Sequence, residues 1–131
     1  MQTKRLPAQP DAIAPDGSAV RILLSVTGGS MAHFELAPGE TSAAVRHRTV
    51  EELWFFLSGL GQMWRRRGEE ETTVDVGPGV SIDIPLGTTF QFRALGDEPL
   101  RAVGVTMPPW PGEDEAILTD GPWKPKGARP L

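Results

Sequence analysis

The sequence has 131 residues, 39% of them hydrophobic and 23% charged, which is enough for one ordinary domain and too few for two. Its formal net charge of -4 offers no concentrated basic face, which argues against nucleic acid as a partner. The absence of cysteine excludes disulfides, thiolate catalysis and zinc–thiolate sites. The sequence has no apolar stretch of bilayer-spanning length and no secretory-signal core at its start, so we expect a cytoplasmic protein without a membrane partner.

Short apolar segments separated by turn residues predict an all-β domain. The 15 Gly and 13 Pro recur between apolar runs and do not form low-complexity tracts. Residues 1–17 contain several prolines and are predicted to be an N-terminal arm without regular structure. About eight short strands of this kind are typical of a β-sandwich or barrel. The predicted strands are residues 18–26, 31–36, 45–57, 61–67, 72–76, 80–84, 90–94 and 100–107.

A Pro- and Gly-rich tail, residues 109–131, follows the predicted barrel at residues 18–108. It contains large apolar side chains, which seldom remain free in water. We therefore expect the tail to pack on the barrel or on a partner subunit. These side chains are Trp110, Ile117, Leu118 and Trp123.

The only basic cluster, residues 65–67, is followed at once by Gly68 and three glutamates at residues 69–71. We interpret this segment as a hairpin tip with opposite charges facing each other across the strands, an ordinary stabilising arrangement. A site for an anionic ligand is the alternative.

Residues 39–59 resemble the first sequence signature of the cupin superfamily. Glu52 stands seven residues before Gly59, and His47 stands five residues before Glu52. The resemblance maps the family's metal-binding glutamate to Glu52 and its second histidine ligand to His47. The first histidine ligand maps to Val45.

Residues 79–94 resemble the second cupin signature. Here the last histidine ligand of the family maps to Phe90 and its final asparagine to Ala94. Together the signatures imply a small, single-domain, cupin-type jelly-roll β-barrel, also called a double-stranded β-helix. The family includes isomerases, decarboxylases, sugar-binding regulators and storage proteins, so the fold does not define the function. The scaffold positions that match are Gly79, Pro85 and Gly87.

The metal motif is degenerate. A catalytic transition metal needs three or four nitrogen and oxygen ligands, and the resemblance supplies only His47 and Glu52. Val45 and Phe90 are bulky and apolar where ligand atoms should project. We therefore expect no cofactor, with a divalent transition metal bound by His47, Glu52 and an unforeseen third ligand as the alternative. His33 could complete such a site only if its face of the strand points inward.

Without a metal, His47 and Glu52 form a candidate catalytic acid–base pair. A carboxylate beside an imidazole in an apolar cavity fixes the imidazole tautomer and raises its pKa toward neutrality. Such a pair would suffice for an isomerisation or enolisation of an activated substrate. A buried hydrogen bond with a purely structural role is the remaining interpretation of these two residues.

Strand periodicity places Trp54 on the same face as Glu52, and aromatic residues of a second strand should join it from the opposite sheet. Aromatic walls with few polar groups are typical of a site for a small, partly apolar molecule or a sugar. Simple core packing is the alternative. The predicted ligand-binding residues are Trp54, Phe90, Phe92 and Gln62.

These observations favour a cupin-like protein that binds a small organic molecule in an aromatic barrel pocket. The alternatives are an isomerase or related enzyme, metal-dependent or metal-free, that uses His47 and Glu52, and an interaction module with a filled barrel.

Leu53, Phe55 and Leu57 make the opposite face of the strand that carries Trp54 apolar as well. Because such a face needs a cover, we expect a homodimer, with docking of the arm or the tail as the intramolecular alternative.

Overall fold

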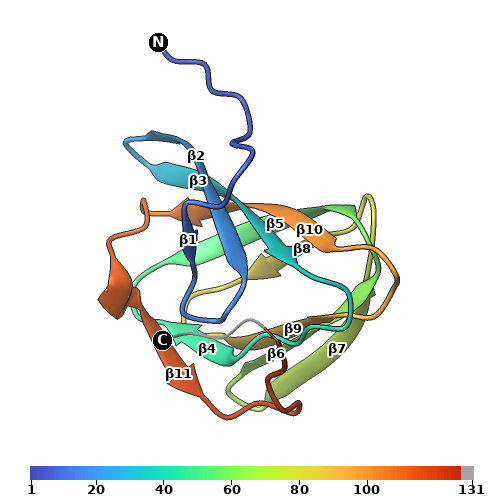
Figure 1. The fold of residues 1–131 in the computed structure, drawn as a ribbon. Coiled ribbons are helices and arrows are strands. Elements are labelled where there is room, and N and C mark those ends of the chain that lie inside the picture. Colours follow the sequence, from blue (N-terminus) through green and yellow to red (C-terminus); the bar gives the residue numbers. More distant parts are fainter. Residues whose placement is uncertain (128–131) are drawn as a thin grey trace.

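Two antiparallel sheets face each other in the computed structural model, which describes residues 1–127 (Figure 1). The predicted all-β fold is confirmed. In spatial order, the six-stranded sheet contains β1 (Ala12–Ile13), β2 (Ala19–Val26), β3 (Gly29–Leu36), β10 (Leu100–Met107), β5 (Glu51–Ser58) and β8 (Ser81–Ile84). The five-stranded sheet contains β11 (Ala116–Thr119), β4 (Ala44–His47), β9 (Thr89–Ala94), β6 (Gly61–Arg67) and β7 (Glu70–Val76). A short 3-10 turn, η1 (Glu113–Glu115), precedes β11.

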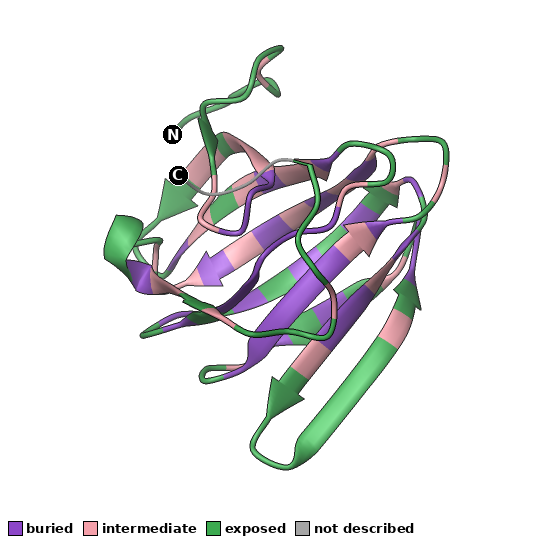
Figure 2. Ribbon diagram, turned by 60° about the horizontal axis from the view of Figure 1, so that its bottom comes forward, coloured by how far each residue is buried: buried purple, intermediate pink, exposed green. Residues whose placement is uncertain are grey.

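Buried and exposed residues alternate along several strands (Figure 2), so one face of each sheet is turned toward the core. In β5 the buried side chains are Glu52, Trp54 and Phe56, while the residues between them are exposed. The core therefore lies between the two sheets and is closed by apolar side chains from both. Its largest fully buried members are Trp54, Phe56, Phe90, Phe92, Leu36 and Met63.

The segment predicted as one strand, residues 45–57, is two strands in different sheets. The turn between them is held by the buried carboxylate of Glu115, which accepts hydrogen bonds from the backbone nitrogens of Thr49 at 2.6 Å and Val50 at 3.1 Å. The hydroxyl of Thr49 donates a third hydrogen bond to this carboxylate. Because Glu115 lies 65 residues from Val50, the local pattern could not show this break.

The N-terminal arm is attached to the edge of the six-stranded sheet. The prediction that it lacks regular structure is wrong at β1, which pairs with β2. The guanidinium of Arg21 donates hydrogen bonds to the carbonyl oxygens of Pro7 at 2.9 Å and Ala8 at 3.2 Å. Residues before Pro7 extend away from the barrel (Figure 1).

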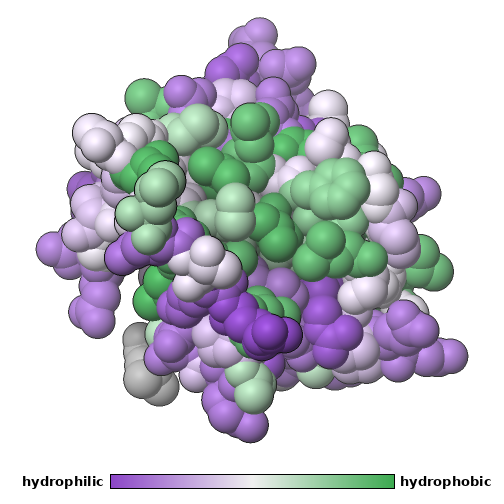
Figure 3. Space-filling model, turned by 90° about the horizontal axis from the view of Figure 1, so that it is seen from above, coloured by the Kyte–Doolittle hydropathy of each residue, from purple (hydrophilic) through white to green (hydrophobic). Residues whose placement is uncertain are grey.

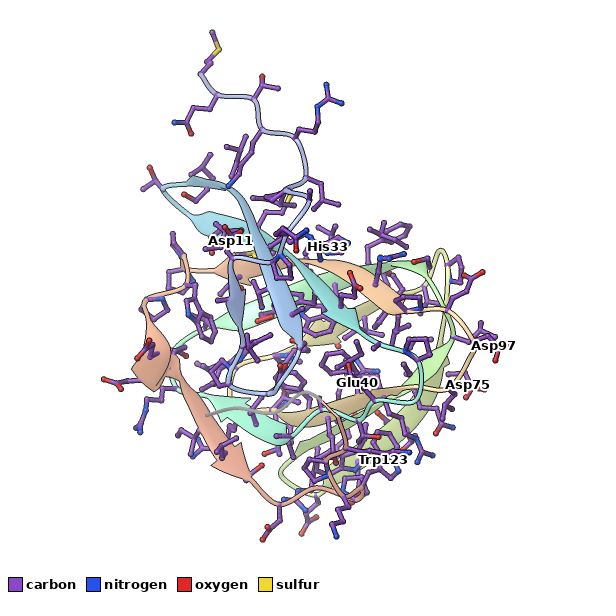
Figure 4. The ribbon with its side chains drawn as sticks, in the orientation of Figure 1. Asp11, His33, Glu40, Asp75, Asp97 and Trp123 are labelled. Atoms are coloured by element: carbon purple, nitrogen blue, oxygen red, sulfur yellow. The ribbon has the colours of Figure 1, made fainter. Side chains whose placement is uncertain are left out.

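The C-terminal segment crosses the outside of the five-stranded sheet. Strand β11 pairs with β4, and the carbonyl oxygen of Trp123 accepts a 2.7 Å hydrogen bond from the amide of Gln91. The guanidinium carbon of Arg93 lies 4.1 Å from the centroid of the Trp123 ring, which Figure 4 labels on this side of the barrel. Of the predicted tail, residues 128–131 lie outside the described residues.

The predicted hairpin at the charge cluster is confirmed. Arg66 pairs with Glu71 and Arg67 with Glu70 on β6 and β7, so opposite charges occupy directly facing positions. The indole nitrogen of Trp64 donates a 2.8 Å hydrogen bond to Glu71. No helix in residues 1–127 has the length and apolar character that spanning a bilayer requires.

Candidate functional site

His47 and Glu52, the two retained positions of the metal motif, meet at one end of the barrel. His47 ends β4 and Glu52 lies near the start of β5, in the facing sheet. Nδ1 of His47 is 3.5 Å from Oε2 of Glu52. Both residues are buried, with 6% and 3% of their surfaces exposed. The structure thus brings the predicted pair together in a site that is largely excluded from solvent.

Burial raises the pKa of Glu52 from 4.5 to about 7. Hydrogen bonds from Trp54 and Thr106 oppose this rise, and the nearby carboxylate of Asp16 adds to it. The indole Nε1 of Trp54 donates to Oε1 at 2.7 Å, which leaves Oε2 facing the imidazole. A glutamate with this pKa is present in both protonation states near neutral pH.

The imidazole of His47 is neutral at pH 7, because burial lowers its pKa to about 4 even though Glu115 acts in the opposite direction. The expectation that a neighbouring carboxylate raises this pKa is therefore wrong, since desolvation of the charged form outweighs the attraction. Among the described residues, Nδ1 has no hydrogen-bond partner. Two aromatic rings lie nearly perpendicular to the imidazole, with centroids 5.3 Å away for Phe90 and 5.1 Å for Trp110.

The donors at this end of the barrel do not fit a transition metal. Val45 and Phe90 pair directly across β4 and β9, and each is only 1% exposed, so apolar side chains fill both positions where further ligands would project. In residues 1–127 no three His, Asp or Glu side chains are grouped so that they could hold a metal ion. Two donors alone bind such an ion poorly.

His33 does not complete the site. It pairs with Val103 on β10, whereas the side chain of its neighbour Phe34 points inward and stacks on Trp54, with ring centroids 4.7 Å apart. Successive side chains of a strand point to opposite faces, so His33 belongs to the outer face of the sheet. Figure 4 labels it in the upper sheet, near the N-terminal arm.

The predicted aromatic residues lie together in the centre of the barrel and pack ring against ring. The Trp54 centroid is 5.0 Å from that of Phe92 and 5.9 Å from that of Phe90. All three are no more than 2% exposed. A Cβ placed on Gly104 would lie 2.7 Å from Phe34 and 2.9 Å from Trp54, which shows how tightly this layer is filled.

Gln62 is not part of this cluster. Its amide nitrogen donates to Asp75 at 3.3 Å, and its amide oxygen accepts from the guanidinium of Arg93 at 2.6 Å. Met63, the next residue, is fully buried and packs in the core. The parity of β6 therefore places Gln62 on the outside of the barrel.

Three residues near the pair were not predicted as site residues. The sequence marks Trp110 only as an apolar residue of the tail, although it packs on His47. The buried carboxylate of Asp16 accepts hydrogen bonds from the backbone and the hydroxyl of Ser18, and burial raises its pKa. Glu115 reaches the site from η1. Only the tryptophan gave a signal in the sequence, because an apolar residue in a polar segment must pack somewhere.

The family model of the cupin domain matches residues 32–106. The chain is also 31% identical over 111 residues to an uncharacterized protein of Methanocaldococcus jannaschii, a match that covers 81% of this chain and 86% of that protein. The chain therefore belongs to the cupin family, as the two sequence signatures predicted.

Solved structures agree with this assignment. A double-stranded β-helix protein from Klebsiella pneumoniae superposes with a TM-score of 0.64 at 18% identity, covering 79% of this chain and 85% of that one. Oxalate decarboxylase from Bacillus subtilis gives 0.70 at 19% identity and CapF gives 0.68 at 20% identity, with 84% and 81% of this chain covered. The chain spans only 29% and 32% of these two proteins.

The predicted double-stranded β-helix is confirmed by these likenesses, which at such identities concern the fold alone. Oxalate decarboxylase of Bacillus subtilis has Mn(II) centres. In the present chain, two of the positions that correspond to the family's metal-binding histidines are occupied by the buried, apolar residues Val45 and Phe90.

Proposed function

We propose that this cupin domain binds a small organic molecule or a sugar, without a resident metal, where His47 and Glu52 meet beneath Trp110. The observation that carries the proposal is Nδ1 of His47, which is buried and has no hydrogen-bond partner among the described residues. A buried polar atom without a partner costs about 1–3 kcal/mol. A ligand hydroxyl or amide that bonds to this nitrogen would recover that cost.

The ligand would find polar and apolar groups side by side. Nδ1 of His47 and Oε2 of Glu52, 3.5 Å apart, offer a hydrogen-bonding pair that a single hydroxyl or amide group can bridge. The ring of Trp110 lies against the imidazole and would offer apolar surface to a ring or a short chain. Few polar groups inside apolar walls are typical of small-molecule sites.

Trp110 would cover this site. Its ring packs against His47 at nearly a right angle, and the residue is still 38% exposed. Its backbone nitrogen is held by a 2.9 Å hydrogen bond to the hydroxyl of Ser30. Rotation of the Trp110 side chain would open a path to His47 without moving the strands. The ligand therefore binds at the end of the barrel and leaves the packed layer around Trp54 intact.

A second function, metal-free acid–base catalysis, is favoured by the direct contact between an imidazole and a carboxyl group in a dry environment. Two such groups 3.5 Å apart can hold and pass one proton when a substrate lies against them. An isomerisation or enolisation of the bound molecule is the reaction that this pair would support. Binding is common to both functions, and turnover distinguishes them.

The first test is elemental analysis for transition metals in protein purified without a chelator or a histidine tag, with His47→Ala as the control. We expect no stoichiometric metal in either protein. Metal that is near-stoichiometric in the wild type and lost in the variant would overturn the proposal of a metal-free site.

The second test is a screen of sugars and small organic acids and alcohols by thermal shift and tryptophan fluorescence. Binding to this site should be weakened at least about tenfold by Trp110→Ala and by His47→Ala. Trp123→Ala is the matched control, because Trp123 lies outside the five-stranded sheet. Ligands that bind all variants equally would contradict the site. NMR of the bound ligand over time then detects any turnover.

A further inference from the structure

A polar hollow of about 250 Å³ opens between the β6–β7 hairpin and the turn that joins β8 to β9. It differs from the outer face of the six-stranded sheet, where hydrophobic side chains gather (Figure 3). A polar group of a ligand would find partners in the hollow and none on that apolar surface. The polar residues that line the hollow are Arg65, Arg67, Glu70, Thr72, Asp83 and Thr88.

Strand register places this hollow next to the candidate site. The residue after Thr88 pairs with the residue before His47 on β4 and with the residue before Arg67 on β6. Continuing the register by one residue sets Thr88 between His47 and Arg67. Since neighbouring strands lie about 4.8 Å apart, the backbones of His47 and Arg67 are about 10 Å apart. One small molecule can therefore reach from His47 to Arg67 across Thr88.

Two polar atoms in the wall of the hollow are buried and have no hydrogen-bond partner among the described residues, namely Oγ1 of Thr88 and Nε of Arg65. Thr88 is only 3% exposed, and it stands two residues before the core residue Phe90, so it shares the inward parity. The arginine N–H can only donate, and the hydroxyl can donate as well. Both atoms therefore fit an acceptor group of a ligand, which would recover the cost of leaving them unpaired.

Arg65 is held in place in a way that leaves Nε unpaired. Its Nη1 donates hydrogen bonds to the carbonyl oxygen and to Oδ1 of Asp83, both at 2.8 Å. The side chain of Asp83 is 63% exposed and has the outward parity of β8. Across the hairpin Arg65 faces Thr72 and not a glutamate. The first arginine of the basic cluster is thus oriented from outside the barrel and takes no part in the cross-strand charge pairs.

Arg67 offers a second guanidinium. Glu70 faces it in register, but among the described residues no carboxylate lies within 4.0 Å of it. A guanidinium can give a planar carboxylate two parallel hydrogen bonds. Because Glu70 and Asp83 are both exposed, water screens their charges. They still offset part of the positive charge, so a singly charged carboxylate fits the hollow better than a doubly charged phosphate.

We propose that the hollow binds the carboxylate of the ligand, which makes the ligand a small organic acid that also carries a hydroxyl group. The carboxylate accepts hydrogen bonds from Arg67, from Nε of Arg65 and from the hydroxyl of Thr88. The hydroxyl group at the other end bonds to Nδ1 of His47. This inference rests on the binding site proposed above and adds the charge of the ligand and the residues that recognise it.

The first experiment compares para-hydroxybenzoate with its amide, which has the same ring and hydroxyl group but no charge. Each is titrated into isotope-labelled protein and followed by NMR, which also detects weak binding. The acid should bind at least about tenfold more tightly than the amide. The acid should also shift the Nε–H signal of Arg65 and the backbone signal of Thr88.

Charge variants test which residues recognise the acid. Arg67→Gln should remove the preference for the acid over the amide. Arg66→Gln is the matched control, because the Arg66 guanidinium lies over the ring of Trp64, 5.4 Å from its centroid, on the outer side of the sheet. Glu70→Gln should tighten binding of the acid, because it removes a like charge.

Thr88→Val separates recognition from stability. The change keeps the shape of the side chain and removes its hydroxyl, so the acid should bind several-fold more weakly. The melting temperature should stay the same or rise, because the wild-type hydroxyl is buried without a partner among the described residues. A purely structural role of this hydroxyl would lower the melting temperature instead.

The outcomes distinguish this inference from the function on which it rests. Equal binding of the acid and the amide, both lost in His47→Ala, would overturn the inference and leave the proposed function intact. An acid that shifts the signals of neither Arg65 nor Thr88 would overturn it as well, and so would binding of the acid that does not change in His47→Ala. The proposed function fails only if, in addition, no molecule of the broader screen depends on His47.

Discussion

The indole of Trp54 donates a 2.7 Å hydrogen bond to the carboxyl group of Glu52, two residues earlier on β5. Both side chains point into the barrel because they share the parity of the strand. The bond occupies Oε1 and leaves Oε2 directed at His47, 3.5 Å from Nδ1. The central aromatic residue of the core thus also fixes the orientation of the acid at the candidate site.

Replacing Trp54 by Phe should lower the free energy of unfolding by about 2–4 kcal/mol, because a cavity forms and a buried carboxyl group loses its donor. Urea denaturation measures this change. Trp123→Phe is the control, since Trp123 lies outside the barrel and its two hydrogen bonds to Gln91 come from the backbone. Equal losses in the two variants would contradict the role given to the Trp54 indole.

Glu52→Gln should change how stability depends on pH. Burial raises the pKa of Glu52 from 4.5 to about 7, so the contribution of this group to stability is fully present below pH 4.5 and is lost as the pH rises through 7. Glutamine does not titrate. The variant should therefore gain stability relative to wild type, by on the order of 3 kcal/mol, between about pH 4.5 and about pH 8.

Chemical denaturation of both proteins across this pH range makes the comparison, with Glu51→Gln as the exposed neighbour that should show no such gain. A difference between Glu52→Gln and wild type that stays constant with pH would show that Glu52 is not held in the protonated form by burial.

Glu115→Gln should destabilise the turn between β4 and β5. Burial alone would raise the pKa of Glu115, but hydrogen bonds from Thr49 and Val50 outweigh it and the pKa is lowered. The stabilisation is therefore present above about pH 4.5 and is lost as the pH falls through the lowered pKa. We expect a loss of about 1.5–3 kcal/mol in the free energy of unfolding at neutral pH, and this loss should shrink in acid.

Glu113→Gln, an exposed change in the same 3-10 turn, should have little effect. A loss independent of pH would argue against the charged hydrogen bonds.

Gly104→Ala tests whether the centre of the barrel is filled. Its Cβ would lie 2.7 Å from Phe34 and 2.9 Å from Trp54, so we expect a loss of about 1–3 kcal/mol from overpacking. Gly28→Ala is the control, because no heavy atom lies within 4 Å of a Cβ there. Tolerance of alanine at position 104 would mean that this layer has room for a ligand, and the site would then extend inward from His47.

The alternation of apolar and polar residues predicted most strands, and two of them, residues 61–67 and 100–107, have the predicted bounds. The glycines and prolines of the two signatures predicted the family, and their spacing led to His47 and Glu52. This succeeded because strand periodicity and turn residues are local properties that a sequence displays directly.

The tertiary structure decided the environment of those two residues. Burial from all sides lowers the pKa of His47 and raises that of Glu52, and these opposite shifts do not follow from their spacing. Trp110 and Glu115 reach the site from more than 60 residues along the chain. The sequence by itself determined which side chains alternate toward a core. Only the packing of one sheet against the other determined how far that core excludes solvent and which distant groups pack against the site. Both depend on contacts between strands far apart in the chain.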